Sequence, residues 1–396
     1  MKNSTKWGTQ TLCVVSGSDV DFSTVRTPTP PIFQSSNYTY ENVDIGTEIL
    51  TGEKPGYIYS RYSNPTVDVV NQVVAEIEGG EEALSFSSGL AAISATALAY
   101  CQPGDHIVAS SLIYGGTYHL FQEHLGRLNI ETTFVNPADT DEVARSIRKN
   151  TRLLYVEPLA NPTLVSADIK GWAELAHQHR CKLVVDNTFT PPPIFFPLRH
   201  GADVVIHSAT KYLGGHSDLV GGVVVSSRQE IETIRPILKY FGGIISPMIA
   251  WLLLRGIRTL GIRLERQCTN AEAMARFLES HSKIQQVNYA GLPSNPQFPL
   301  NRKQFNGYSG MLSFEVKGGF QAAKKVMQQL QLIKFTVSLG DVATLISHPA
   351  STSHIYLTPE ERASIGVTDG LLRISAGIEE TQDLLEDLNQ ALGAID

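Results

Sequence analysis

The chain has 396 residues, which is long enough for a large hydrophobic core and for two domains. Hydrophobic residues make up 42% of the chain, charged residues make up 18%, and the formal net charge is −7, values that are typical of a globular enzyme. The negative charge and the lack of any run of basic residues argue against nucleic-acid binding. The four cysteines lack metal-ligand spacing, and no apolar run suits a signal peptide or a membrane span, so we expect reduced thiols and a cytoplasmic protein.

Residues 1–60 have no clear hydrophobic periodicity and are rich in threonine, proline and serine. Three prolines between positions 28 and 31 predict an extended arm. At its end, Arg61 lies two residues after Tyr59, and an arginine with a nearby tyrosine can bind a phosphate through paired hydrogen bonds. By spacing alone, a surface turn at 64–65 is the simpler interpretation of this segment.

Helical and strand patterns alternate between residues 67 and 226. A helix is predicted over 67–78, where valines and an isoleucine recur on one side and two glycines follow. Strands are predicted at 83–86, 106–109, 130–135, 152–157, 182–186, 203–207 and 221–226, with helical segments between most of them. This alternation predicts a mainly parallel sheet covered by helices on both faces.

The pattern changes after residue 246. We expect a long helical region over 249–280, a loop over 291–306, a strand at 311–316, a helix over 319–331, short strands at 343–347 and 371–374, and a final helix over 380–392. These elements predict a smaller α+β domain. The chain is therefore expected to divide into an arm (1–60), a large domain (61–245) and a C-terminal domain (246–396).

The most informative stretch is DVVIHSATKYLGGHS, residues 203–217. It reads as a buried strand that runs into a polar loop, where Ser208 and Thr210 precede Lys211 and two glycines allow a tight turn. Such a lysine lies at the carboxyl edge of a sheet, where open α/β sheets bind ligands. The hydroxyls can bind a phosphate and the lysine can form a Schiff base, as pyridoxal phosphate (PLP) requires. An isolated Ser-x-Thr-Lys is equally compatible with a surface lysine.

Three further features agree with a PLP site. Asp186 ends a buried strand, and its carboxylate could keep a pyridine nitrogen protonated. Residues 88–90 (Ser-Gly-Leu) precede an alanine-rich helix, whose free N–H groups and dipole form an anion site. Ser88 could equally serve only as a helix cap. Tyr114 follows a strand and precedes two glycines, so its ring could stack on a flat cofactor.

As a whole, residues 203–217 resemble the PLP-attachment signature of the Cys/Met-metabolism (transsulfuration) enzymes, and the resemblance extends from about Tyr57 to Glu379. Within that family the chain is most similar to methionine γ-lyase and O-acetylhomoserine sulfhydrylase. The resemblance implies an α/β protein of PLP-dependent fold type I (aspartate aminotransferase-like), with a mainly parallel seven-stranded sheet flanked by helices. It also implies a homotetramer made of two active dimers, in which the arm contacts the neighbouring subunit.

The resemblance also implies roles for individual residues. Lys211 would carry the Schiff base and move protons, and Tyr114 would exchange a proton at the γ leaving group. The cofactor-binding residues implied are Tyr59, Arg61, Ser88, Gly89, Leu90, Tyr114, Asp186, Ser208, Thr210 and Lys211. Among these, Tyr59 and Arg61 would bind the PLP phosphate of the adjacent subunit, so that the site is complete only in an oligomer.

The substrate-binding residues implied by the resemblance are Asn161, Ser338 and Arg373. Arg373 lies within a strand between apolar neighbours, so its charge needs an anionic partner. By resemblance that partner is the substrate α-carboxylate, and a structural salt bridge is the alternative. Asn161 precedes a proline and could simply form a turn. No metal site is expected, because no histidine has a partner at ligand spacing.

The expected reaction is γ-elimination on a γ-substituted L-amino acid, as in methionine γ-lyase, which gives a 2-oxo acid and ammonia. The alternatives are γ-replacement on O-acetylhomoserine, and a γ-lyase that acts on cystathionine or canavanine. A PLP-binding protein without turnover is a third class. Val337 stands where cystathionine-processing relatives carry a glutamate, which argues against cystathionine. Gly116 stands where methionine γ-lyases carry a cysteine, which argues for a wider pocket.

Overall fold

The computed structural model describes residues 7–17, 20–22, 25–355 and 357–395. Its larger sheet has seven strands in the order β3-β9-β8-β7-β6-β4-β5. Their bounds are β3 Glu82–Phe86, β4 His106–Ser110, β5 Glu131–Val135, β6 Thr151–Val156, β7 Lys182–Asp186, β8 Val204–His207 and β9 Gly222–Ser226. Only β9 runs antiparallel to its neighbours, β8 and β3. The predicted α/β fold with a mainly parallel seven-stranded sheet is confirmed.

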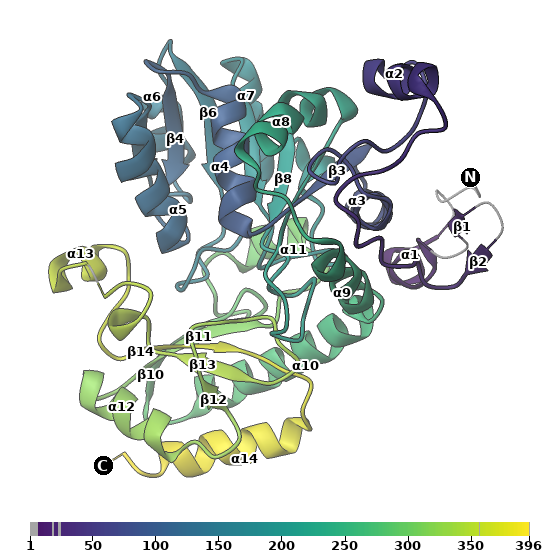
Figure 1. The fold of residues 1–396 in the computed structure, drawn as a ribbon. Coiled ribbons are helices and arrows are strands. Elements are labelled where there is room, and N and C mark those ends of the chain that lie inside the picture. The colour runs from purple at the N-terminus through teal and green to yellow at the C-terminus, as the bar shows by residue number, and fades with distance from the viewer. Residues whose placement is uncertain (1–6, 18–19, 23–24, 356, 396) are drawn as a thin grey trace.

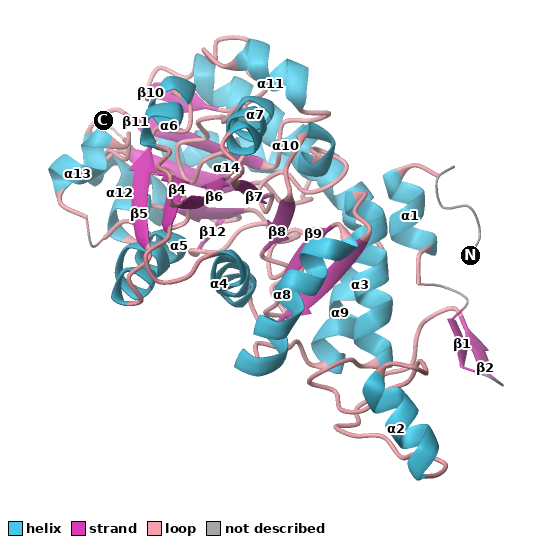
Figure 2. Ribbon diagram, turned by 90° about the horizontal axis from the view of Figure 1, so that it is seen from above, coloured by secondary structure: helices cyan, strands magenta, loops and turns pink. Residues whose placement is uncertain are grey.

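Helices cover both faces of this sheet because its central strands are apolar on both sides. In β7, Leu183 and Val185 pack in one core, whereas Val184 packs in another. The first core includes α3 (Pro65–Glu78), α7 (Ile169–Gln178) and α9 (Pro247–Ile257), and the second includes α4 (Gly89–Tyr100) and α8 (Arg228–Phe241). Figure 2 shows α4 and α8 on one side of the sheet and α7 on the other. The shorter α5 (Gly115–His119) and the π-helical turn that follows it (Leu120–Leu125) lie on the side of α4, whereas α6 (Thr140–Ser146) packs on the side of α7.

The N-terminal region is more regular than the predicted extended arm. It contains α1 (Thr9–Val15), a hairpin of β1 (Val20–Phe22) and β2 (Val25–Thr27), and α2 (Val43–Thr51). Leu12 and Cys13 of α1 are buried in the core beside α3. The side chain of Asn42 caps α2, and Gly52 ends it in a left-handed conformation. The predicted extended arm therefore contains short helices and a hairpin within its described residues, and residues 1–6, 18–19 and 23–24 lie outside the described part. Its contact with a neighbouring subunit stays a prediction.

The C-terminal part contains a second sheet, with strand order β10-β11-β14-β13-β12. Its strands are β10 Ile284–Asn288, β11 Met311–Val316, β12 Lys334–Phe335, β13 Leu345–Ser347 and β14 Leu371–Ser375. Its helices are α10 Leu260–Ser280, α11 Phe298–Gln304, α12 Gly319–Gln329, α13 Pro359–Ser364 and α14 Thr381–Leu392. Figure 1 shows α12 and α14 below this sheet and the larger sheet above it. The helix predicted over 249–280 is two helices, α9 and α10, because the chain turns at Arg258 and Thr259.

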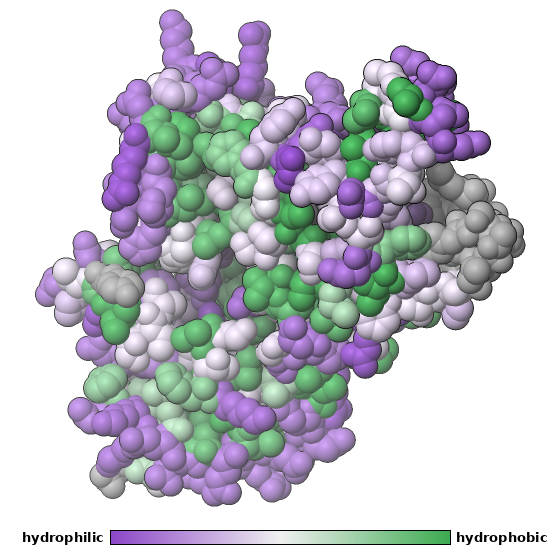
Figure 3. All heavy atoms as spheres, viewed as in Figure 1, coloured by the Kyte–Doolittle hydropathy of each residue, from purple (hydrophilic) through white to green (hydrophobic). Residues whose placement is uncertain are grey.

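The two sheets meet along a junction that is partly apolar at the surface. Figure 3 shows hydrophobic side chains gathered near this junction, whereas hydrophilic side chains cover the upper and lower ends of the molecule. Among the helices that the structure describes, none combines the length and the hydrophobicity that a membrane span needs.

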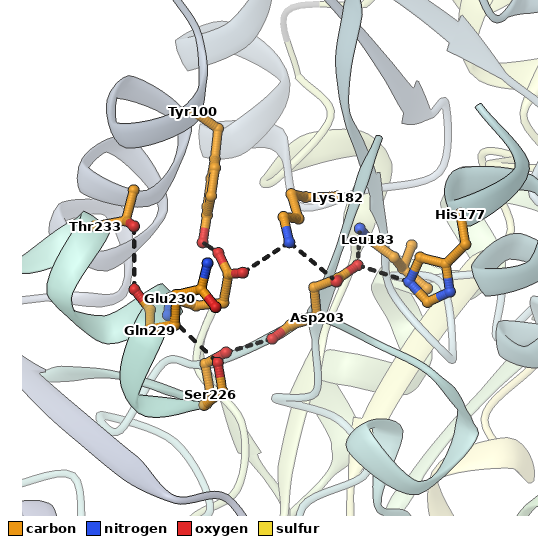
Figure 4. Close-up of polar contacts among 10 residues, drawn as sticks. Tyr100, His177, Lys182, Leu183, Asp203, Ser226, Gln229, Glu230 and Thr233 are labelled. Atoms are coloured by element: carbon orange, nitrogen blue, oxygen red, sulfur yellow. Dashed lines mark hydrogen bonds and ion pairs between the residues drawn. The ribbon is translucent and has the colours of Figure 1, made fainter. Parts of the chain in front are cut away.

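A polar cluster joins the starts of β7 and β8 to α8 (Figure 4). Lys182 Nζ lies 2.7 Å from Glu230 Oε1 and 3.5 Å from Asp203 Oδ1. Asp203 also lies 3.1 Å from His177 Nε2, and Tyr100 donates a hydrogen bond of 2.5 Å to Glu230. The cluster lies at the opposite end of β7 from Asp186, so it anchors the strands without entering the candidate site.

Candidate active site

A cavity of about 270 Å³ lies between the carboxyl ends of the large sheet and the five-stranded sheet. This is the edge at which parallel α/β sheets bind ligands. The predicted site residues that line it are Ser88, Gly89, Leu90, Tyr114, Asn161, Asp186, Ser208, Thr210, Lys211 and Arg373. Segments far apart in the sequence therefore converge on one cavity.

Lys211 reaches the cavity from the loop that follows β8. Its Nζ donates a hydrogen bond of 3.2 Å to Oγ of Ser338, which is also one of the predicted substrate-binding residues. Burial lowers the pKa of Lys211, and the nearby charge of Arg373 lowers it further. A lowered pKa favours the neutral amine, which is the nucleophilic form of lysine.

The loop behind Lys211 is held by close backbone packing. Gly215 has a positive φ of 75°, and its N–H donates to the Lys211 carbonyl over 2.7 Å. The buried guanidinium of Arg263 donates to the carbonyls of Tyr212 (2.9 Å) and Gly256 (2.8 Å). A Cβ atom at position 215 would lie 2.1 Å from Nη1 of Arg263, so only glycine fits there. The predicted tight turn is thus present, and an arginine secures it.

Asp186 lies at the end of β7 with three hydrogen-bond donors around its carboxylate. Thr188 donates from its backbone N–H (3.1 Å) and its hydroxyl (2.5 Å), and Tyr155 donates from its hydroxyl (3.1 Å). Burial raises the pKa of Asp186, and the hydrogen bonds from Thr188 and Tyr155 oppose that rise. Thr188 and Tyr155 were not predicted as site residues. Thr188 lies two positions after Asp186, and Tyr155 lies on β6, the strand beside β7.

The first turn of α4 and the residues around Ser208 form an anion cradle. Free N–H groups at a helix start favour a phosphate. A Cβ atom at Gly89 would lie 3.0 Å from Cβ of Ser208, so the absence of a side chain lets the helix start lie against the serine. Ser88 Oγ accepts the N–H of Ala91 over 3.1 Å, which bears out the helix-cap interpretation of this residue. Thr210 is oriented by hydrogen bonds of 3.0 and 3.2 Å to the backbone of Gly221.

Arg373 extends from β14 into the same cavity. Its Nη1 donates to Asn161 Oδ1 over 2.8 Å, and its Nη2 donates to the Ser338 carbonyl over 3.1 Å. Its buried Nε has no hydrogen-bond partner, and no carboxylate pairs with it in the described part of the chain. Burial lowers the pKa of Arg373 to about 10. Within the described residues Arg373 therefore forms no structural salt bridge, and its guanidinium can bind an anion in the cavity.

Tyr114 precedes α5 and lines the cavity, and the residue as a whole is 47% exposed. Its backbone N–H donates to Glu157 Oε1 over 2.7 Å. The ring lies directly over Gly116, where a Cβ atom would come within 2.5 Å of Cε1. The glycine therefore allows the phenol to adopt this position.

Tyr59 and Arg61 do not line the cavity of their own chain. Arg61 Nη1 donates to the Lys239 carbonyl over 2.6 Å, and its guanidinium lies 4.9 Å from the Tyr62 ring centroid and 5.4 Å from that of Tyr59. Their assignment to the site of an adjacent subunit stays a prediction.

Several residues that line the cavity were missed from sequence. They are Ile93, Glu157, Thr188, Phe189, Val220, Leu339 and Ser353. Most lie in loops, where no periodic pattern marks them. The sequence did contain a signal for Glu157 as a site residue. It directly follows a buried strand, in the same way that Asp186 ends one.

The residues present fit PLP. The cavity holds a lysine amine of lowered pKa, a buried carboxylate opposite it, an anion cradle at a helix start, and an arginine with an unpaired buried Nε. Together with the seven-stranded sheet, this arrangement is that of a PLP-dependent enzyme of fold type I. Within the described residues, no cluster of side chains could hold a metal ion.

The chain belongs to the family of Cys/Met metabolism PLP-dependent enzymes, whose model matches residues 10–393. Its cofactor is accordingly pyridoxal 5'-phosphate. The chain is 43% identical to an L-methionine gamma-lyase from Fusobacterium nucleatum subsp. polymorphum, over 92% of this chain and 93% of that protein. It is 39% identical to an O-succinylhomoserine sulfhydrylase from Pseudomonas aeruginosa, over 92% and 90%. The crystal structure of metB from Corynebacterium glutamicum is similar with a TM-score of 0.92, at 38% identity and 99% coverage of both chains.

Proposed function

We propose that this protein catalyses γ-elimination on a γ-substituted L-amino acid and releases a 2-oxo acid and ammonia. The observation that carries the proposal is that Lys211, Tyr114 and Arg373 face one cavity. When bound, PLP supplies an electron sink that stabilises negative charge on the substrate carbon beside the amino group. The protein's own residues must then bind the substrate carboxylate and move protons.

Each of these residues has a place suited to one task. Arg373, oriented by Asn161, binds the α-carboxylate through a charge-assisted hydrogen-bond pair. Lys211 Nζ, held by Ser338, carries protons between neighbouring substrate carbons. The Tyr114 hydroxyl exchanges a proton with the leaving group at the γ-carbon. Asp186, with its three donors, provides the negative charge that a pyridine nitrogen needs to stay protonated.

Part of the cavity is lined by apolar side chains, and this favours a substrate whose distal group is uncharged. Val337 and Val220 line this part with 64% and 59% of their surfaces exposed, and Leu339 lies beside them. An apolar wall would leave a charged amino group unpaired. This favours a methionine-like substrate over cystathionine, in agreement with the lyase relative.

The second candidate reaction is γ-replacement on a homoserine ester such as O-acetylhomoserine, in which a sulfur nucleophile takes the place of the leaving group. The observation that favours it is Gly116. Without a side chain there, the Tyr114 ring lies back on the glycine, and the cavity keeps room for an acceptor. The sulfhydrylase relative agrees with this alternative.

We further propose that two subunits complete each other's sites and that two such dimers form a homotetramer. In support, Arg61 and the partly exposed Tyr59 lie outside their own cavity, and Tyr240 and Phe241 beside them are 74% and 73% exposed. The proposed units are an arm over 1–60, a large domain over 61–245 and a C-terminal domain over 246–396. The four free thiols support a cytoplasmic location.

The test of the reaction is a substrate panel of methionine, homocysteine, cystathionine, O-acetylhomoserine and canavanine, each incubated with PLP-loaded protein with and without sulfide. We expect 2-oxobutyrate and ammonia to form from the best substrate without sulfide. Formation of a new amino acid only in the presence of sulfide would identify γ-replacement instead.

Replacing Lys211 tests the site itself. Lys211→Ala should abolish both the visible absorbance of lysine-bound PLP and turnover, because no other amine lines the described cavity. The control is Lys170→Ala, which changes an exposed lysine on α7 and should alter neither property. Absorbance spectra and ammonia release measure the two effects. Turnover that survived in Lys211→Ala would contradict the assignment.

A further inference from the structure

Two carboxyl groups lie side by side beneath the candidate site. Asp186 ends β7, and Glu157 directly follows β6. The parallel register pairs Val156 with Val185, so the next positions are Glu157 and Asp186. Neighbouring parallel strands lie about 4.8 Å apart, and paired residues point to the same face. Both side chains line the cavity, so a single environment must accommodate two acids.

The two carboxyl groups have unequal hydrogen-bond partners. Three donors surround Asp186, as described above, and they stabilise its negative charge. Within the described residues Glu157 has one hydrogen-bond donor, the backbone N–H of Tyr114 at 2.7 Å from Oε1, and it is only 6% exposed. Two carboxylates at such a separation in a dry site do not both ionise, and the proton stays on the less stabilised one.

We propose that Glu157 is a neutral carboxylic acid that positions Tyr114. Its carbonyl oxygen Oε1 accepts the Tyr114 amide, its other oxygen carries a proton, and Asp186 stays ionised. The neutral group fixes the start of α5, and hence the phenol, without adding a second negative charge beside Asp186. Glu157 is thus a positioning residue that acts through Tyr114.

The charges around Glu157 agree with this protonation. Burial raises the pKa of Glu157 well above its ordinary value, the charge of Asp186 raises it further, and the Tyr114 N–H opposes the rise. The other titratable groups around the pair are Tyr155 on β6, His207 at the end of β8, and Lys211 and Arg373 across the cavity. A cation does not contact Glu157 within the described residues, so nothing there favours its ionised form.

The inference rests on the proposed function only for the role of Tyr114. The first test of the neutral acid does not require a turnover assay. Infrared spectra of the PLP-loaded protein at neutral pH should contain the carbonyl stretch of a protonated carboxylic acid that Glu157→Gln removes. Glu131→Gln, which changes an exposed glutamate paired with Arg148, should leave that band in place. Identical spectra of the wild type and Glu157→Gln would overturn the proposal.

The second test separates the proton from the anchoring hydrogen bond. Glu157→Gln keeps a carbonyl acceptor for Tyr114 and should retain most of kcat. Glu157→Ala leaves the Tyr114 amide unpaired and should lower kcat by about tenfold or more, with KM nearly unchanged. Equal losses in both variants would overturn the neutral-acid assignment. If Glu157→Ala does not fold, Glu157→Gln alone tests the assignment. A large loss of kcat in Glu157→Gln would then overturn the neutral-acid assignment. If the wild type turned over no substrate, the infrared result would still settle the state of Glu157.

Discussion

The ring of Tyr114 lies so close to Gly116 that even one added carbon would force it to move. Gly116→Ala should therefore displace the phenol from the cavity and lower kcat by about tenfold to a hundredfold, because a shift of about 1 Å in a catalytic group has effects of that size. Steady-state kinetics measure the loss, and near-ultraviolet circular dichroism checks the fold.

Gly126→Ala provides the matched control for this prediction. A Cβ atom at Gly126 would meet no atom within 4 Å, so this variant should keep wild-type activity. If Gly116→Ala had the kcat of the wild type, the phenol would not depend on the glycine. The substrate preference that we infer from Gly116 would then lose its physical basis.

Site residues that lie in local sequence motifs were predictable from the sequence, whereas the distant residues that hydrogen-bond to them were not. Lys211 and Asp186 each follow or end a buried strand, and such strands are recognised by their apolar runs. Ser338, which accepts the lysine's hydrogen bond, is 127 positions away along the chain. Arg263 is likewise 51 positions from the carbonyl of Tyr212 that it holds. Contacts of this kind depend on tertiary packing, which single-sequence patterns do not encode.

Among the elements, α14 is tied to the loop between α12 and β12 through one carboxylate. Asp387 accepts the backbone N–H groups of Gln331 (2.8 Å), Leu332 (3.0 Å) and Ile333 (2.9 Å). Burial raises the pKa of Asp387, but these three hydrogen bonds and a fourth from the Gln390 side chain together lower it more, and the net result is a lowered pKa. A carboxylate with a lowered folded-state pKa stabilises the protein above its unfolded pKa, and this stabilisation is lost as the pH falls through the folded value.

Asp387→Asn should therefore lower the free energy of unfolding by about 1–3 kcal/mol at neutral pH, where the lost bonds are charge-assisted. The gap between the variant and the wild type should narrow below a pH of about 4, the ordinary pKa of aspartate, because the carboxylate of the unfolded chain then takes up a proton while the native carboxylate stays ionised to lower pH. Urea unfolding at both pH values measures this. A gap that did not change with pH would contradict an ionised Asp387.

The elements of the larger sheet were predicted better than those of the smaller one. Strands such as β7 are buried on both faces and stand out as continuous apolar runs. By contrast, β12 has only two residues, both exposed, and β10 contains two adjacent glutamines, so neither has a recognisable pattern. Helix α2 was missed, although its cap residues, Asn42 and Gly52, are recognisable in the sequence.

At the scale of the whole molecule, the site exists only because the two sheets dock. Arg373 comes from the smaller sheet, whereas its partner Asn161 follows β6 of the larger one. Val342 N–H donates to the Gly215 carbonyl over 3.0 Å, which joins the smaller part to the lysine loop. The relative placement of the sheets therefore determines the distance between Lys211 and Arg373.

Tyr59 and Arg61 lie outside their own cavity, and this supports the proposal that a second subunit completes the site. If Arg61 serves the neighbouring site, Arg61→Ala and Lys211→Ala should each be nearly inactive alone but should complement each other when mixed. In a hybrid dimer, the site that keeps Lys211 receives an intact Arg61 from its partner. Random pairing of equal amounts would restore about a quarter of wild-type activity, since half of the dimers are hybrids and each has one intact site.

The experiment mixes the two variants under conditions that allow subunits to exchange, and follows ammonia release over time. Each variant incubated alone under the same conditions is the control for slow reactivation. Activity that rises as hybrids form would place Arg61 in the neighbouring site. Activity no greater than the sum of the two separate variants would instead mean that Arg61 acts within its own chain, and that the contact with the Lys239 carbonyl is its functional position.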